Sequence, residues 1–200
     1  MPRFGRRSND RVWEVALRVA REELAAAGDA VGVLDVEVQS PGAPRTAGTR
    51  LDAAMRAFMD AGERLEGATG PGDLAAIGEA LERTRYEIAC TRALLTGGRI
   101  PERSAPCLFD PAHGPSAREP AWGRDERPVP ACADDADRLA RGEPPQVRLI
   151  AVGDRAAPYW DVPGAYGPLL EGYYARFGGA RRLAGLLAGT RLGEALASER

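Results

Sequence analysis

Proline recurs every few residues between Pro101 and Pro130, and this spacing constrains the fold more than any other feature of the sequence. Proline lacks an amide hydrogen and clashes with the preceding helical turn, so no long helix can cross this stretch. The residues before it carry long patterns with helical periodicity, interrupted only at short links. The sequence therefore predicts a helical first half followed by an irregular segment.

The N-terminal pattern predicts a helix whose start is capped by Ser8, Asn9 or Asp10. Gly28 and Gly32 lower helix propensity, so we expect this helix to end near Gly28. The alternation from Val33 to Val38 also fits a short extended segment. Apolar side chains recur in steps of four and three residues, the spacing of one helix face packed lengthwise on another: Trp13, Leu17, Ala20, Leu24, Ala27, Val31 and Leu34.

Two more helices are expected before the proline-rich segment. A loop from Ser40 to Gly48 precedes a helix from Thr49 to Leu65. The sequence Gly70-Pro71-Gly72-Asp73 then breaks the chain and supplies a cap for a third helix, which ends at Gly97-Gly98. In both helices, apolar side chains recur in the same steps of four and three residues, which we call a four-three seam. Residues 8–98 are therefore predicted to form an antiparallel helical hairpin or a three-helix bundle.

Residues 101–158 are predicted to form a small irregular module, with a short helix from Asp134 to Arg141. The run from Val147 to Val152 is the best strand candidate, and Gly153-Asp154 would form a turn, so the module holds at most a short β-hairpin. Residues 159–200 are predicted to form an aromatic arm that folds back across the helices, followed by an amphipathic helix over 181–198. The fold class is thus mainly α.

Two of the three cysteines and the only histidine lie within this module. The spacing is Cys107-x5-His113 and then, after a gap of eighteen residues, Cys132-x2-Asp135. Zinc is bound by sulfur, imidazole nitrogen and carboxylate oxygen at the corners of a tetrahedron. We therefore predict a Zn²⁺ site formed by Cys107, His113, Cys132 and Asp135. Two alternatives stay open: the cysteines are small buried packing residues beside a hydrogen-bonded histidine, or Cys107 and Cys132 form a disulfide.

Composition excludes several classes of protein. The net charge is −2, from 27 basic and 29 acidic residues, so no basic face is expected for nucleic acid or an anionic membrane surface. No apolar run reaches the roughly 20 residues that a membrane-spanning helix needs. The basic start of the chain lacks the apolar segment of a secretory signal, and the cysteine count is odd. We expect a cytoplasmic protein with reduced thiols.

The module also resembles a group of uncharacterised actinobacterial proteins. The likeness rests on Pro101-Glu102-Arg103, on the segment from Cys107 to Pro115, and on Val129-Pro130-Ala131-Cys132. In that group a Cys-Phe-Phe-(Asp/Asn)-Pro-x-His-Gly-Pro segment and a Val-Pro-x-Cys-x-x-(Cys/Asp) segment follow a helical region. Here Leu108 replaces the usual first Phe, and Asp135 stands where some relatives carry a second Cys. The resemblance implies an architecture and no reaction.

The sequence carries no phosphate-binding loop and no Gly-x-Ser-x-Gly nucleophile motif. We therefore predict a non-catalytic interaction or scaffold protein that acts through a protein partner or through self-association. The alternative is a small zinc-dependent hydrolase that uses Cys107, His113 and Cys132 as ligands. In that case a water would complete the coordination, and Asp110 or Asp134 would act as the base.

Overall fold

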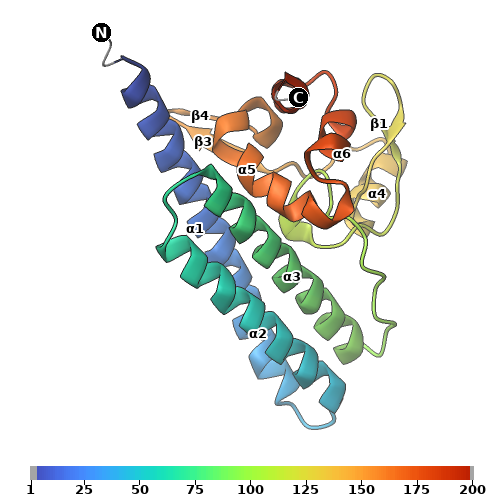
Figure 1. Cartoon of the computed structure of the whole chain (residues 1–200). Helices are drawn as coiled ribbons and strands as arrows, with labels where there is room; N and C mark the ends of the chain where they lie inside the picture. The colour runs from blue at the N-terminus through green and yellow to red at the C-terminus, as the bar shows by residue number, and fades with distance from the viewer. Residues whose placement is uncertain (1–3, 199–200) are drawn as a thin grey trace.

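The computed structural model describes residues 4–198, with side chains described from residue 10 to residue 195. Three long helices form an elongated bundle: α1 (Phe4–Val38), α2 (Arg45–Glu66) and α3 (Pro71–Leu95). The remaining chain packs against one end of this bundle, on the side of α3 (Figure 1). The mainly α fold class is confirmed, and of the two predicted arrangements, hairpin or three-helix bundle, the structure has the bundle.

Helix α1 is longer than the sequence predicted at both ends. It begins at Phe4, so residues 8–10 lie inside the helix and do not cap it. It also continues through Gly28, where a Cβ atom would lie 3.1 Å from the ring of Phe58 on α2. Gly28 thus allows close packing of α1 on α2 and does not end the helix. Residues 33–38, whose alternation also fitted an extended segment, are helical too, because Val31 and Leu34 are buried in a core cluster that also contains Ile88 of α3.

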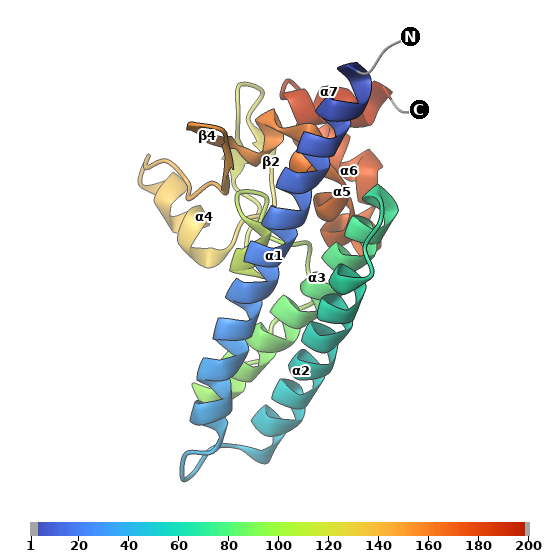
Figure 2. The same ribbon diagram turned by 90° about the vertical axis from the view of Figure 1, so that its left-hand side faces the viewer.

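The links between the three helices are short. Helix α2 begins at Arg45, four residues before the expected start, directly after Pro44. Helix α3 begins at Pro71, and the carboxylate of Asp73 accepts hydrogen bonds from the backbone N–H groups of Thr69 and Gly70 at 2.8 and 3.0 Å. The predicted cap before α3 is therefore confirmed. Figure 2 shows α1, α2 and α3 running side by side along the length of the bundle.

The module between residues 101 and 158 contains two pairs of antiparallel strands, where at most one hairpin was expected. Strands β1 (Ala121–Trp122) and β2 (Arg127–Pro128) form the first pair. The second pair is β3 (Leu149–Val152) and β4 (Arg155–Pro158), joined by the predicted turn at Gly153-Asp154. Between the two pairs lies α4 (Ala133–Ala140), within a residue of its predicted bounds.

The C-terminal part is more helical than predicted. The expected aromatic arm forms a 3₁₀ turn (Tyr159–Asp161) and then helix α5 (Pro163–Tyr174), despite Pro168 inside the helix. A second 3₁₀ turn (Ala175–Phe177) follows. The single helix expected over 181–198 is two helices, α6 (Gly179–Leu186) and α7 (Arg191–Ser198). They are separated at Gly189, whose φ of +86° lies in the left-handed region that favours glycine.

Burial explains why α5 forms. The arm does fold back across the helices, because Tyr166, Tyr173 and Tyr174 are fully buried. Helix α5 crosses α3 at close range, and two glycines make this possible: a Cβ on Gly78 would collide with the carbonyl of Leu169, and one on Gly172 with the carbonyl of Ala75. The tertiary contact thus overrides the low intrinsic propensity of a segment that contains glycine and proline.

One core cluster joins the three parts of the chain. It contains Leu81 of the bundle, Phe109 and Ile150 of the module, and Tyr166 and Leu183 of the C-terminal helices. A second, smaller cluster lies toward the other end of the bundle, between α1, α2 and α3. The module is therefore anchored to the bundle by shared apolar packing as well as by polar contacts.

Candidate metal centre

Backbone hydrogen bonds place the two cysteine-bearing segments next to each other. The N–H of Leu108 donates to the carbonyl of Pro130 at 2.7 Å, so residues 107 and 132 lie near the same point of the module. The N–H of Cys107 donates to the carbonyl of Gly114 at 3.0 Å, which closes the loop that carries His113. Proline and glycine, which weakened the helical pattern here, form the tight turns that such a loop needs.

His113 ends a single 3₁₀ turn, Pro111–His113. Asp110 caps this turn, since its Oδ1 accepts a hydrogen bond from the N–H of Ala112 at 2.8 Å. The next residue, Gly114, has a φ of +87°, a conformation that residues with side chains rarely adopt. The local sequence Asp-Pro-Ala-His-Gly therefore holds the imidazole at the end of a short, well-defined turn.

Cys132 and Asp135 occupy the start of α4. Cys132 is the N-cap residue, and its Sγ accepts a hydrogen bond from the N–H of Asp135 at 3.4 Å. The Oδ1 of Asp135 accepts a hydrogen bond from the backbone N–H of Gln146 at 2.7 Å. The x2 spacing thus places both side chains on the same side of the first helical turn, where the partial positive charge of the helix end favours anions.

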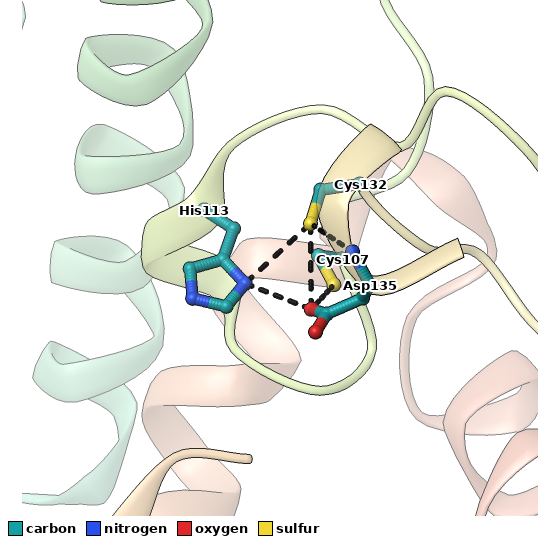
Figure 3. Close-up of side chains that lie close together, drawn as sticks. All are labelled: Cys107, His113, Cys132 and Asp135. Atoms are coloured by element: carbon teal, nitrogen blue, oxygen red, sulfur yellow. Dashed lines mark hydrogen bonds and ion pairs between the residues drawn. The ribbon is translucent and has the colours of Figure 1, made fainter. Parts of the chain in front are cut away.

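All four predicted ligands converge, and one ligand atom of each lies within 4.8 Å of the others (Figure 3). The Oδ2 of Asp135 is 3.3 Å from each of the two sulfur atoms and 3.0 Å from Nδ1 of His113. The Sγ of Cys132 is 3.6 Å from the same nitrogen. Zinc bond lengths of about 2.0–2.3 Å imply tetrahedral edges of roughly 3.3–3.8 Å. These four residues could hold a metal ion after small side-chain shifts.

The cluster is closed on one side and open on the other. The side chains of Cys107 and Asp135 are fully buried, whereas Cys132 is half-buried and His113 is exposed. These two residues line a groove of about 560 Å³ that continues along the C-terminal part of α3, past Arg92, and includes Arg99. A metal ion at the centre would therefore be reached from this groove only past Cys132 and His113.

The four groups shift one another's pKa values in opposite directions. The pKa of Cys132 is lowered to about 6, chiefly because the Cys107 thiol donates a hydrogen bond to its sulfur. The same interaction, together with burial, raises the pKa of Cys107. The pKa of His113 is raised to about 9, first by its hydrogen bond to Cys132 and then by the charge of Asp110. Burial raises the pKa of Asp135, but the Gln146 N–H and the two thiols outweigh it, so the net shift is downward.

The two carboxylates considered as bases lie outside this group. Asp110 is close to the other ring nitrogen, with its Oδ2 4.0 Å from Nε2 of His113. It therefore faces the side of the imidazole away from Cys132 and Asp135 and can stabilise the ring through its charge. Asp134 is exposed and lines the groove beside Cys132. The third cysteine, Cys90, is a free, fully buried residue of α3, as expected for a packing residue.

Sequence reasoning missed a second polar cluster, centred on Glu23 of α1. Its side chain is 2% exposed and accepts hydrogen bonds from the hydroxyls of Tyr166 and Tyr173, both at 3.3 Å. The guanidinium groups of Arg148 and Arg85 lie 3.2 and 4.0 Å from its carboxylate. Burial, and secondarily the charge of Asp110, raises the pKa of Glu23. The sequence does indicate that Glu23 is buried, because position 23 falls three residues after Ala20 and four before Ala27, on the apolar face of the helix.

Comparisons with protein-family models, with curated proteins and with solved structures find no significant match to this chain. The resemblance to actinobacterial proteins therefore stays a prediction. Within the described residues, none of the helices combines the length and the apolar character needed to cross a membrane.

Proposed function

We propose that Cys107, His113, Cys132 and Asp135 bind one Zn²⁺ ion that stabilises the module of a non-catalytic interaction protein. The observation that carries this proposal is the convergence of four donors of the types that zinc prefers, with separations of 3.0–3.6 Å for four of their six pairs. Two cysteine sulfurs, one imidazole nitrogen and one carboxylate oxygen supply four ligands. A four-ligand site of this kind is typical of structural zinc, because no position is left for a reacting water.

The surroundings of the cluster support a structural role. The four side chains come from three pieces of the module: the segment at Cys107, the 3₁₀ turn that ends at His113, and the start of α4. A metal ion would join these three pieces at one point, and its binding energy would then contribute directly to folding of the module. Cys107 and Asp135 are fully buried, so an ion there would be shielded from solvent on the inner side.

The interaction role rests on the bundle. Apolar side chains are exposed on its outer helices, including Val33 and Val36 of α1 and Met55 and Met59 of α2. Exposed valine and methionine side chains on long helices suit contact with a protein partner or with a second copy of the chain. Mass measurement in solution tests the second possibility, because a strict monomer excludes self-association.

Elemental analysis of the purified protein tests the metal proposal. We expect about one zinc per chain, lost in Cys107→Ser and in His113→Ala. Cys90→Ala is the matched control, because Cys90 is as buried as Cys107 but lies outside the cluster, and it should keep the zinc. Zinc-free protein with unchanged folding in all variants would reduce the cluster to packing and hydrogen bonding.

The hydrolase alternative has one observation in its favour, the groove that reaches Cys132 and His113 beside Asp134. A reacting water would need Asp135 to leave the metal or the coordination number to rise to five. Cobalt(II) substitution separates the two proposals. A closed site should give the intense visible bands of tetrahedral thiolate-bound cobalt, unchanged by added azide, whereas an open site should change its spectrum when azide binds.

A further inference from the structure

We infer that the two cysteines of the cluster form a reversible disulfide when a peroxide oxidises them, and that this reaction ejects the metal ion. The inference concerns regulation of the same site and rests on the proposed zinc binding. It is carried by three features of the cluster: the proximity of the two sulfurs, their unequal exposure, and the weakness of the ligand set that would remain.

The two sulfurs already face each other across a single oxygen atom. Each Sγ lies 3.3 Å from Oδ2 of Asp135, and the two sulfurs are within 4.8 Å of each other (Figure 3). A disulfide needs the sulfurs to approach to about 2.05 Å. The side chains would have to close that gap by rotating toward each other, while the hydrogen bond from Leu108 to Pro130 holds their backbone segments together.

The exposure of the two thiols assigns their roles. Cys132 is half-buried and lines the groove of about 560 Å³, so a small oxidant can reach its sulfur. Cys107 is fully buried and does not line this groove. This is the arrangement of an attacked cysteine and a resolving cysteine. Cys90 is fully buried on α3 and is not part of the group, so it has neither role.

The chemistry balances with hydrogen peroxide as the oxidant. The sulfur of Cys132 attacks one peroxide oxygen, the O–O bond breaks, and hydroxide leaves and takes up a proton to form water. The product is a sulfenic acid on Cys132. The sulfur of Cys107 then attacks the sulfur of Cys132, the S–S bond forms, the S–O bond breaks, and a second hydroxide leaves as water. Two thiolates lose two electrons in total, and the peroxide gains them.

Loss of both thiolates would remove the strong ligands. Only the imidazole of His113 and the carboxylate of Asp135 would remain, and the Asp135 side chain is already held by the N–H of Gln146. Zinc bound by one nitrogen and one oxygen is held far more weakly than zinc bound by two thiolates as well. Oxidation would therefore convert the module from a metal-linked to a disulfide-linked form.

The experiment is a peroxide titration of the full-length zinc-loaded protein, with a chromophoric chelator to report free zinc. Thiol counts and intact mass are measured in the same samples. We expect release of one zinc per chain, a fall from three free thiols to one, and a mass decrease of two hydrogens. Peptide mapping should join residues 107 and 132, and dithiothreitol with added zinc should restore the starting state. The Cys90→Ala variant should release zinc in the same way.

Other outcomes would overturn the inference. They are retention of zinc with all three thiols intact, oxidation of Cys132 to a sulfinic acid while Cys107 stays free, and a disulfide that includes Cys90. These readings use the wild-type chain, so the inference can be tested even if Cys107→Ser does not fold. If the untreated protein contains no zinc but forms the 107–132 disulfide, the metal proposal fails while the disulfide stands.

Discussion

Gln146 orients Asp135: its backbone N–H donates a 2.7 Å hydrogen bond to Oδ1 of that carboxylate. The other oxygen, Oδ2, is thereby left to face both thiols and the imidazole. Gln146 follows α4 by six residues, so the geometry of the cluster depends on how the chain leaves this helix as well as on how it enters it. In known metal sites, loss of a hydrogen bond that orients a ligand typically lowers metal affinity by roughly 10–100-fold.

Replacing Asp135 by asparagine tests this arrangement. The side chain keeps its shape, but it loses the negative charge that faces the sulfurs, and we expect zinc affinity to fall by roughly tenfold or more. Competition with a chelator of known affinity measures the change. The control is Asp134→Asn, because Asp134 is the exposed neighbour on the same helical turn. Equal affinities for the two variants would show that the carboxylate of Asp135 does not contact the metal.

Replacing Asp110 tests whether its charge supports metal binding by the imidazole of His113, and we expect a smaller effect than for Asp135. Its Oδ2 lies 4.0 Å from Nε2 of His113, which is beyond hydrogen-bond distance and within reach of electrostatic attraction. Asp110→Asn should therefore weaken zinc binding by about tenfold or less, the lower end for residues that orient a ligating histidine. The same competition assay reports it. Unchanged affinity would mean that the loop holds His113 without help from this charge.

The close crossing of α3 and α5 gives a prediction about stability. A Cβ on Gly78 would collide with the backbone carbonyl of Leu169, and backbone atoms cannot move aside as a flexible side chain can. Gly78→Ala should lower the free energy of unfolding by about 1–3 kcal/mol, the usual cost of overpacking. Urea denaturation followed by circular dichroism measures it.

Gly32→Ala is the matched control for this substitution. Gly32 also lies inside a helix, but nothing stands within 4 Å of an added Cβ. Alanine there should stabilise the protein by about 0.5–1 kcal/mol through helix propensity alone. If both variants lost stability to the same extent, close packing of α5 on α3 would not be the reason for glycine at position 78.

The buried carboxyl group of Glu23 leads to a prediction about how the stability of the protein depends on pH. Its pKa is raised above the ordinary value of 4.5, chiefly by burial, so ionising it costs more in the folded than in the unfolded state. The stability that this group contributes is fully present below pH 4.5 and is lost as the pH rises through the folded-state pKa. The free energy of unfolding of wild type should therefore fall relative to that of Glu23→Gln as the pH rises from 4 to 7.

Urea titrations of both proteins across this range measure the difference. The comparison cancels the titration of all other groups, provided that the variant keeps the contacts of Tyr166 and Tyr173. A difference that grows in favour of wild type as the pH rises would contradict the prediction. It would mean that Arg148 and Arg85 stabilise the ionised carboxylate more than burial destabilises it.

The sequence was most informative where one local pattern determined the structure. The four-three seam from Trp13 to Leu34 predicted the face of α1 that packs on the bundle, and Asp73 predicted the start of α3. The convergence of the four candidate ligands was also predictable, because the spacing of Cys, His and Asp within the proline-rich segment fits a shared site. The distances between them depend on contacts such as Leu108 to Pro130, which no local pattern reveals.

The failures came where a tertiary contact reversed a local preference. By its helix propensity alone, Gly28 indicates the end of a helix, but in the bundle it makes room for the ring of Phe58. Gly172 and Pro168 disfavour a helix, yet α5 forms because its tyrosines are buried against α1 and α3. Glycine has two opposite uses, as a helix breaker and as a point of close helix contact, and only the packing partner decides between them.

Cys132→Ala tests whether the module and the bundle respond separately to loss of the cluster. The substitution removes a metal ligand and the side chain that caps α4, so we expect lower stability of residues 101–158. Amide hydrogen exchange should speed up at Leu108, Asp135 and Gln146, whose N–H groups bond within the module. Amides near Leu51 and Ile88 should keep their protection, because those side chains belong to the separate core cluster at the other end of the bundle. Uniform acceleration in both regions would show that the shared core around Phe109 and Leu81 makes the chain a single cooperative unit.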